Sequence, residues 1–445
     1  MTGKTNELKQ ELGLGAVITN VLSISIGSGI FLLPALVYAI LGHGSILAYI
    51  FCGIIFLCLG LCFGELSSRI PDTGGMYVYI ERAFGPMAGF ISNILYWFGV
   101  GVLACGALMN ALADIAAGYF PIFEETPTRI LFFAGIVALT AFLNIKGIRN
   151  SMVLIKILTW TKVIALMILV SIALTRIEIG NISWQGFPPF ASVGEATLLL
   201  IFAFLGGELA LASSGETKNA SRNAPLGFLI GVILVVLGFS TIHLAAQGVL
   251  GESMLENPEA PLAELAKALF GEAGFILVLI LSFIAVWSTL SSILTLQPRI
   301  IFAGAKDRLI PPVLAKIHPK YGTPYIAILF LAILNFAFAA TGSFRYLLVL
   351  VTGASLVIYF GAVLSFLKLR WNSKSQRPGQ FFVPAGNLLG VFTLILLAWV
   401  FFQLSKTELL AIGASIFVLA ALFLLLEFLK KRKNQSSPPL KTLRN

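Results

Sequence analysis

The sequence alternates between long runs of apolar residues and short polar segments along its whole length. A run of about 20 apolar residues is long enough to cross a bilayer as a helix. By this rule the pattern predicts twelve membrane-spanning helices with short connections. The predicted spans are 14–41, 45–68, 87–118, 129–146, 151–175, 191–214, 226–249, 272–304, 324–341, 345–369, 387–405 and 408–429.

The same pattern predicts how the chain is divided. The spans form one all-α transmembrane domain, residues 14–429, because no polar segment between them is long enough for a soluble domain. A polar N-terminal segment, residues 1–13, precedes it, and a basic tail, residues 430–445, follows it. No small-residue cleavage site follows the N-terminal segment, so we expect no removable signal peptide.

The first predicted span is interrupted at its middle. Gly27 and Gly29 flank Ser28 where a spanning helix should be most regular. Glycine is a poor helix former and allows a close approach of backbone to backbone or to a ligand. A helix broken in the membrane exposes N–H and C=O groups that need protein, ligand or water as partners. The stretch therefore indicates either a discontinuous helix that holds a polar substrate or a small-residue packing face.

The sixth predicted span is interrupted in the same way. Gly206, Gly207 and the carboxylate of Glu208 break an apolar run near its middle. Interruptions in corresponding spans of two five-helix halves are the best sequence indication of a transporter site. N–H groups at the start of a half-helix suit a carboxylate, and carbonyls at the end of a half-helix suit an ammonium. The pair of interruptions therefore favours a zwitterionic amino acid as substrate.

Composition and charge agree with a membrane protein. The 445 residues are 58% hydrophobic and only 11% charged, and the net charge is +10. If the N-terminus is cytoplasmic, 23 of the 30 Lys and Arg residues lie in cytoplasmic segments and five on the other side. This asymmetry predicts a multi-pass protein of the plasma (inner) membrane with both termini in the cytoplasm. The basic residues thus reflect topology, and no motif for nucleic-acid binding accompanies them.

The reactive side chains do not indicate an enzyme, a metal site or a bound cofactor. The four cysteines lie inside apolar spans without the spacing of metal ligands or of a disulfide framework. The three histidines are scattered over different spans and loops, and no nucleophile lies near a base in the sequence. Two ionisable residues inside spans, Lys162 and Glu208, are candidates for function, because charges in the membrane are costly.

Several motifs, in order along nearly the whole chain, resemble the amino acid–polyamine–organocation (APC) permeases. The motifs are Gly27-Ser28-Gly29-Ile30-Phe31, the segment 71–86 with Pro71-Asp72-Thr73-Gly74-Gly75, the segment 202–225 from Phe202 to Pro225, and Lys306-Asp307-Arg308-Leu309-Ile310-Pro311. The resemblance implies the leucine-transporter-type fold, in which two inverted five-helix repeats contain discontinuous helices 1 and 6 and two further helices follow. It also implies an amino acid transporter.

The resemblance implies roles for individual residues. The backbone around Ser28, Gly29 and Ile30 is expected to bind the substrate carboxylate, and Gly27, Gly206 and Gly207 are further expected substrate-binding residues. The carbonyls of Ser25, Phe202 and Leu205 are expected to receive the substrate amine. Glu208 matches a gating position, and Lys162 matches a lysine of sodium-independent members whose ammonium replaces a structural sodium. The partners of that ammonium are predicted to be carbonyls near Gly27 and the hydroxyls of Thr289 and Ser292.

The function predicted from the sequence is sodium-independent secondary active transport of small or medium neutral L-amino acids by alternating access. Gly207 stands where many members of the family carry a bulky residue, and one carboxylate lies near the predicted site, which favours neutral substrates over polyamines. The alternatives are a cationic amino acid or polyamine transporter of the same family and an amino acid sensor with the same fold. Exchange and proton symport, uptake and export, and the oligomeric state all remain open at this point.

Overall fold

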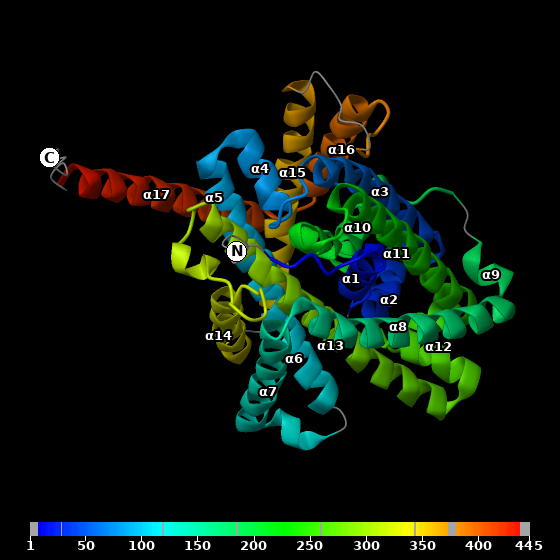
Figure 1. The fold of residues 1–445 in the computed structure, drawn as a ribbon. Helices are drawn as coiled ribbons and strands as arrows, with labels where there is room; N and C mark the ends of the chain where they lie inside the picture. The colour runs from blue at the N-terminus through cyan, green and yellow to red at the C-terminus, as the bar shows by residue number, and fades with distance from the viewer. Residues whose placement is uncertain are drawn as a thin grey trace, which may run out of the picture.

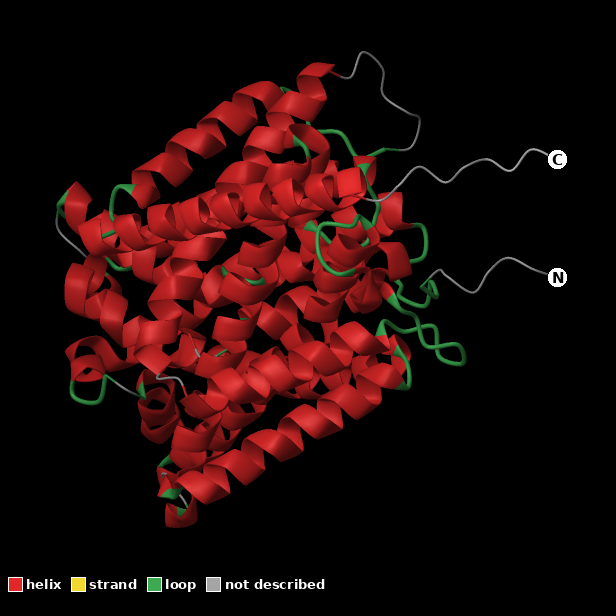
Figure 2. Ribbon diagram, turned by 90° about the vertical axis from the view of Figure 1, so that its left-hand side faces the viewer, coloured by secondary structure: helices red, strands yellow, loops and turns green. Residues whose placement is uncertain are grey.

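The computed structural model describes residues 8–27, 29–117, 120–183, 186–258, 260–341, 344–372 and 380–436. These ranges are almost entirely helical, with a single isolated bridge between Leu12 and Thr217 (Figures 1 and 2). The α-helices are α1 (Leu14–Ser25), α2 (Gly29–Leu41), α3 (Ile46–Arg69), α4 (Met76–Phe84), α5 (Pro86–Ile94), α6 (Leu103–Ala117), α7 (Thr126–Ile145), α8 (Ile148–Ala173), α9 (Ile179–Ile182), α10 (Phe190–Phe204), α11 (Ala220–Leu250), α12 (Pro261–Phe270), α13 (Glu272–Lys306), α14 (Tyr325–Thr341), α15 (Phe344–Asn372), α16 (Gly386–Phe401) and α17 (Lys406–Ser436).

Short helical segments of other types join these helices. The π-helical η2 continues α5 directly into α6. The 3-10 segment η5 follows α10 and leads toward α11. These segments are η1 (Gly42–Gly44), η2 (Leu95–Val102), η3 (Pro121–Glu124), η4 (Leu174–Arg176), η5 (Gly207–Glu216), η6 (Gly251–Leu255) and η7 (Pro312–Ala315).

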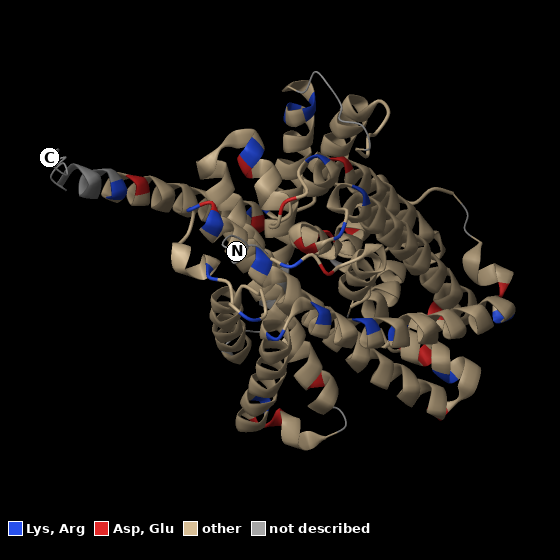
Figure 3. Ribbon diagram, in the orientation of Figure 1, with Lys and Arg blue, Asp and Glu red and all other residues tan. Residues whose placement is uncertain are grey.

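The apolar runs of the sequence form long helices. Within the described ranges, eight helices are long and apolar enough to cross a membrane, and the bent pair α1 and α2 would make a ninth. Three shorter apolar helices lie in α10, α14 and α16. Long stretches of these helices carry neither acidic nor basic residues, as Figure 3 shows. The structure is thus that of an all-helical membrane protein.

The helices differ in how much of their surface the protein covers. On α8, Ile157, Ile164 and Met167 are exposed, whereas Lys162 on the same helix is fully buried. In a soluble protein apolar side chains are buried and charged ones are exposed. On α8 the reverse holds, because lipid rather than water surrounds the apolar face. The final helix, α17, has no buried residue in its apolar stretch and extends away from the other helices (Figure 1).

The helix α13 runs through the middle of the molecule, where α1, α6 and α8 pack against it (Figure 1). On another side of α1 lies α11, and small residues allow the close approach of these two helices. A Cβ atom on Gly227 would lie 2.7 Å from Val17, and one on Gly231 would lie 2.6 Å from Val21. Small residues at such crossings are typical of helix packing in membranes, where burial of apolar surface provides little driving force for helix association. Residues of α1 therefore occupy the centre of the helical assembly.

Candidate functional site

The first predicted span is in two pieces. The helix α1 ends at Ser25, α2 begins at Gly29, and the two pieces are bent by 49°. The N–H groups of Ile26 and Gly27 donate to the carbonyls of Leu22 and Ser25, which closes the end of α1. A Cβ atom on Gly29 would lie 2.9 Å from the Cβ of Ala203, so only glycine allows this approach of α2 to α10. Ser28 lies outside the described residues.

The sixth predicted span is also interrupted. The helix α10 ends at Phe204, and Gly206 adopts a left-handed conformation with φ +91° before η5 begins. Glycine takes this conformation without the steric cost that a side chain would bring. The backbone of Phe202 belongs to α10, and its side chain lies outside the described part of the chain.

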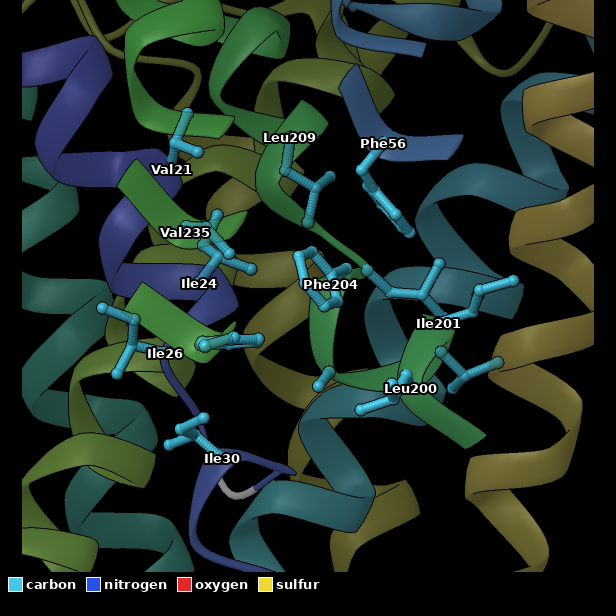
Figure 4. Packing of buried hydrophobic residues seen from close by; sticks show 14 of the residues in the cluster. Val21, Ile24, Ile26, Ile30, Phe56, Leu200, Ile201, Phe204, Leu209 and Val235 are labelled. Carbon is cyan, nitrogen blue, oxygen red and sulfur yellow. The ribbon is translucent and has the colours of Figure 1, made fainter. Parts of the chain in front are cut away.

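The two interruptions lie against each other. A Cβ atom on Gly206 would be 2.6 Å from Ile24, and one on Gly207 would be 3.0 Å from the hydroxyl of Ser25. Figure 4 shows Ile24 and Ile26 of the first interruption in one buried cluster with Phe204 and Leu209 of the second. The glycines that break the helices are therefore the residues that allow the breaks to meet.

A cavity of about 60 Å³ lies where the interruptions meet. One water needs about 10–15 Å³ of such space, so the cavity has room for a small solute of several heavy atoms. Predicted site residues that line it are Ser25, Gly27, Gly29, Leu205, Gly206 and Thr289. Two further predicted residues do not line it: Ile30 is buried elsewhere in the core, and Gly207 lines a neighbouring space.

The opposite wall of the cavity comes from residues that sequence reasoning missed. They belong to the third predicted span and to two later helices, and most of them are aliphatic. The available signal was the series of small residues in the third span, since Gly99, Gly101, Ala104 and Ala107 favour a close approach. The missed residues of this wall are Val100, Ala104, Ala107, Leu108, Ile293 and Val351, and Ile24, Ala203 and Leu209 beside the interruptions were missed as well.

The ammonium of Lys162 is bonded to the first interruption. Its Nζ donates to the carbonyls of Ser23 at 2.8 Å, Ile26 at 2.5 Å and Ala285 at 3.4 Å. An ammonium has three N–H donors, so the three carbonyls satisfy it completely although the side chain is fully buried. Lys162 therefore joins α8 to the end of α1 and to α13.

The hydroxyls predicted to contact the ammonium bond to Ser23 instead. Thr289 Oγ1 donates to the Ser23 carbonyl at 2.7 Å, and Ser292 Oγ donates to the Ser23 hydroxyl at 2.7 Å. Ser288 shares that hydroxyl at 2.7 Å. The hydroxyls thus hold the backbone that Lys162 binds. The ammonium itself is bonded to carbonyls at the helix break.

Glu208 is buried beside the cavity rather than in it. Tyr359 donates to its Oε2 at 2.7 Å, and the other carboxylate oxygen has no hydrogen-bond partner among the described residues. The residue lines a space of about 10 Å³ together with Ser25, Gly207 and aromatic side chains of α3. This space holds about one water molecule. Glu208 therefore shares this small space with Ser25 and does not line the main cavity.

The geometry defines a class of protein, namely a multi-pass helical membrane protein with a small enclosed cavity between two interrupted helices. The family model described as amino acid permease matches residues 12–428. The chain belongs to this family, and its curated relatives are amino acid transporters of the APC superfamily, as the motifs predicted.

Curated relatives differ in what their names say they carry. The chain is 24% identical over 352 residues to the branched-chain amino acid permease BcaP of Bacillus subtilis (strain 168), covering 73% of each chain. It is 28% identical over 347 residues to the serine/threonine exchanger SteT of the same organism, covering 74% of this chain and 76% of the relative. A third relative, cationic amino acid transporter 9, chloroplastic, of Arabidopsis thaliana is 25% identical and covers 71% of this chain and 58% of its own length. These relatives are transporters rather than enzymes.

Proposed function

We propose that the chain is a sodium-independent secondary active transporter that moves a small or medium neutral L-amino acid across the plasma membrane by alternating access. The observation that carries the proposal is the cavity bordered by both interruptions, with the ammonium of Lys162 bonded at the first. The strong preference of Lys and Arg for one side supports a topology with both termini in the cytoplasm.

Two helix ends of opposite polarity support recognition of a zwitterion. The N-terminal end of α2, at Gly29 and Ile30, presents N–H groups and the positive end of a helix dipole. The C-terminal end of α10, near Leu205, presents carbonyls and the negative end. In the proposed complex the substrate carboxylate lies at the start of α2, and the amine lies between the carbonyls of Ser25 and Leu205.

The residues that line the cavity support a substrate with a neutral side chain. Ala104 and Ala107 leave room at the wall, and Leu108 and Ile293 are aliphatic. The described lining contains no carboxylate, so a second positive charge on the substrate would be desolvated without a partner. The relatives named for branched-chain amino acids and for serine and threonine agree with this choice. Cationic amino acids and polyamines are the competing substrates.

The order of the helices supports the predicted architecture of twelve spans. The bent pair α1 and α2 comes first, and the eight long and three shorter apolar helices follow in the order of the remaining predicted spans. Counted in this way the interruptions fall in the first and the sixth spans, which supports two five-helix repeats. In this architecture one set of helices rocks against the other around the cavity, while Lys162 fixes α1 to α8.

A flux assay with purified protein in proteoliposomes tests the function. Labelled neutral amino acids such as serine, alanine and valine should enter, and unlabelled neutral amino acids should compete, with and without internal substrate and a pH gradient. Stimulation by internal substrate would identify exchange, and stimulation by an inward proton gradient would identify symport. If arginine or putrescine displaces the substrate better than neutral amino acids do, the proposed substrate class is wrong. Binding without flux would identify a sensor.

A further inference from the structure

The third predicted span contains a rare helical form next to the cavity. The segment η2, Leu95–Val102, is π-helical, so its N–H groups donate to the carbonyl five residues earlier instead of four. The N–H of Leu103, directly after the segment, still donates to the carbonyl of Phe98. Because π-helical segments are rare and frequently occur at functional sites, this one calls for a local cause and a local consequence.

The local cause is the side chain of Gln297 on α13. Its Nε2 donates to the carbonyl of Trp97, inside η2, at 2.6 Å. Asn335 of α14 donates from Nδ2 to Oε1 of Gln297 at 3.4 Å, which orients the amide with its nitrogen toward η2. Gln297 and Asn335 are both fully buried. A side chain that bonds into the backbone ladder is a common cause of irregular helix geometry.

Gly101 makes room for this amide. A Cβ atom on Gly101 would lie 2.5 Å from Nε2 and 2.6 Å from Cδ of Gln297, so a larger residue would push the amide away from η2. Gly99 allows a similar approach on another side, because a Cβ atom there would lie 2.9 Å from the Cβ of Ala354 on α15. The segment η2 is therefore held between α13 and α15.

The consequence concerns the wall of the cavity. Val100 of η2 lines the cavity, and Ala104 and Ala107 of α6 continue the same wall. A π-helical turn takes up about one residue more than an α-helical turn, and one residue corresponds to a rotation of about 100°. Conversion of η2 to an α-helix would therefore turn a neighbour of Ala104, Leu103 or Cys105, toward the cavity. Both neighbours are larger than alanine.

We propose that Gln297 is a positioning residue that holds η2 in its π-helical form and thereby sets the size of the substrate side chain that the cavity accepts. The inference deepens the proposed transport function and rests on it for the nature of the ligand. Gln297 is not among the residues that line the cavity. It acts through Val100 and the alanines of α6, and it does not touch the substrate.

Two variants remove the contact in different ways. Q297M keeps the length of the side chain and its apolar packing but lacks the N–H donor. G101A keeps Gln297 and displaces its amide from Trp97. In both variants η2 should become α-helical, because the regular ladder no longer competes with the amide of Gln297.

Asn93 of α5 provides the matched control. This residue is also fully buried, and its Nδ2 donates to the carbonyl of Ile300 on α13 at 3.0 Å. N93L therefore removes a side-chain amide bond to α13 from the same span, but outside η2. It should lower thermal stability about as much as Q297M does and leave η2 π-helical.

The first measurement is the hydrogen-bond register of η2 in cryo-electron microscopy structures of the variants, determined in nanodiscs without substrate. The expected result is an α-helical segment in Q297M and G101A and a π-helical segment in N93L. A π-helix that persists in folded Q297M and G101A would overturn the inference. Loss of folding in both variants, with N93L folded, would show a purely structural role and would also overturn it.

The second measurement is the KM for uptake of alanine and of valine into proteoliposomes. The quotient of the valine KM over the alanine KM should rise about tenfold in Q297M and G101A, because a tighter pocket discriminates against added methyl groups by at least this factor. N93L should leave the quotient unchanged. A purely structural role would lower the maximal rate for both substrates without changing the quotient.

The two measurements fail separately. An unchanged quotient in variants whose η2 has become α-helical would refute the role of Gln297 in substrate size. The register of η2 is determined without flux, so a protein that transports no amino acid would refute the proposed function, while a π-helix retained in Q297M and G101A would still refute the role of Gln297 in η2.

Discussion

At the scale of single residues, Lys162 is the side chain that joins α8 to the end of α1 and to α13. In Lys162→Ala the carbonyls of Ser23, Ile26 and Ala285 lose the ammonium, and Ser23 alone of the three keeps a side-chain donor, Thr289. Each unpaired buried group costs about 1–3 kcal/mol, so α1 should lose its fixed position and uptake should fall to background. The measurement is uptake into proteoliposomes at equal amounts of folded protein.

A matched control is available on the same helix. Lys156 is exposed on α8, so Lys156→Ala removes an identical charge and should leave uptake close to that of the unmodified protein. Full activity of Lys162→Ala would show that the ammonium is dispensable for transport.

Gly29 tests the close contact at the start of α2. In Gly29→Val the new side chain would meet Ala203, whose Cβ would be 2.9 Å from that of the new residue. Overpacking of this kind costs about 1–3 kcal/mol, which a folded membrane domain can tolerate, but the side chain would also enter the cavity. We expect folded protein with uptake reduced at least tenfold.

Gly135→Val serves as the control for Gly29→Val, because a Cβ atom on Gly135 of α7 would meet no atom within 4 Å. Uptake and the elution profile in size-exclusion chromatography are compared for both variants. Normal substrate affinity in a folded Gly29→Val variant would contradict the placement of the substrate at this helix end.

At the scale of elements, the two interruptions should behave as one unit. A Cβ atom on Gly207 would lie 3.0 Å from the hydroxyl of Ser25, so Gly207→Ala forces the two breaks apart and Ser25→Ala relieves the contact. The melting temperature of the double variant should therefore exceed the value expected from adding the two single shifts, since groups in contact couple by about 0.5–3 kcal/mol. Strict additivity would show that the breaks tolerate the extra atom independently.

The position of each interruption could be predicted from sequence, but their contact could not. Glycines in the middle of an apolar run are a local signal, and both helices are in fact broken there. The approach of Gly206 to Ile24 joins residues far apart in the chain, and no local pattern encodes it. For the same reason the hydroxyls of Thr289 and Ser292 bond to Ser23, which the sequence did not single out.

The cavity wall from the third span was missed for a different reason. The stretch η2 is π-helical, which shifts the faces of α6 relative to those expected from a regular α-helix. Hydropathy reports only that this segment is apolar, since alanine and leucine score well whether they face lipid or a cavity. The short helices α4 and α12 were also not predicted, because they lie between spans and are too short for the criterion used.

At the scale of the whole molecule, the arrangement of helices around Lys162 bears on the energy source. In a sodium-driven carrier, oxygens from several helices would coordinate a bound cation, and the cation would hold those helices together. Here the oxygens of Ser23, Ile26 and Ala285 already receive the three N–H donors of one ammonium. A further cation at this position would meet the positive charge of Lys162 at close range. The cycle should therefore proceed without sodium.

Replacement of sodium by choline in proteoliposomes tests this expectation. Uptake by the unmodified protein should be unchanged at constant ionic strength and pH, because the ammonium is part of the chain and is not depleted with the ion. A strict requirement for sodium would show that Lys162 does not substitute for a bound cation.

An inward proton gradient decides between two roles of the same side chain. If Lys162 is a fixed strut, any stimulation of uptake by the gradient comes from other groups. If stimulation occurs and is lost in a Lys162→Ala variant that retains exchange, the lysine itself carries the coupled proton.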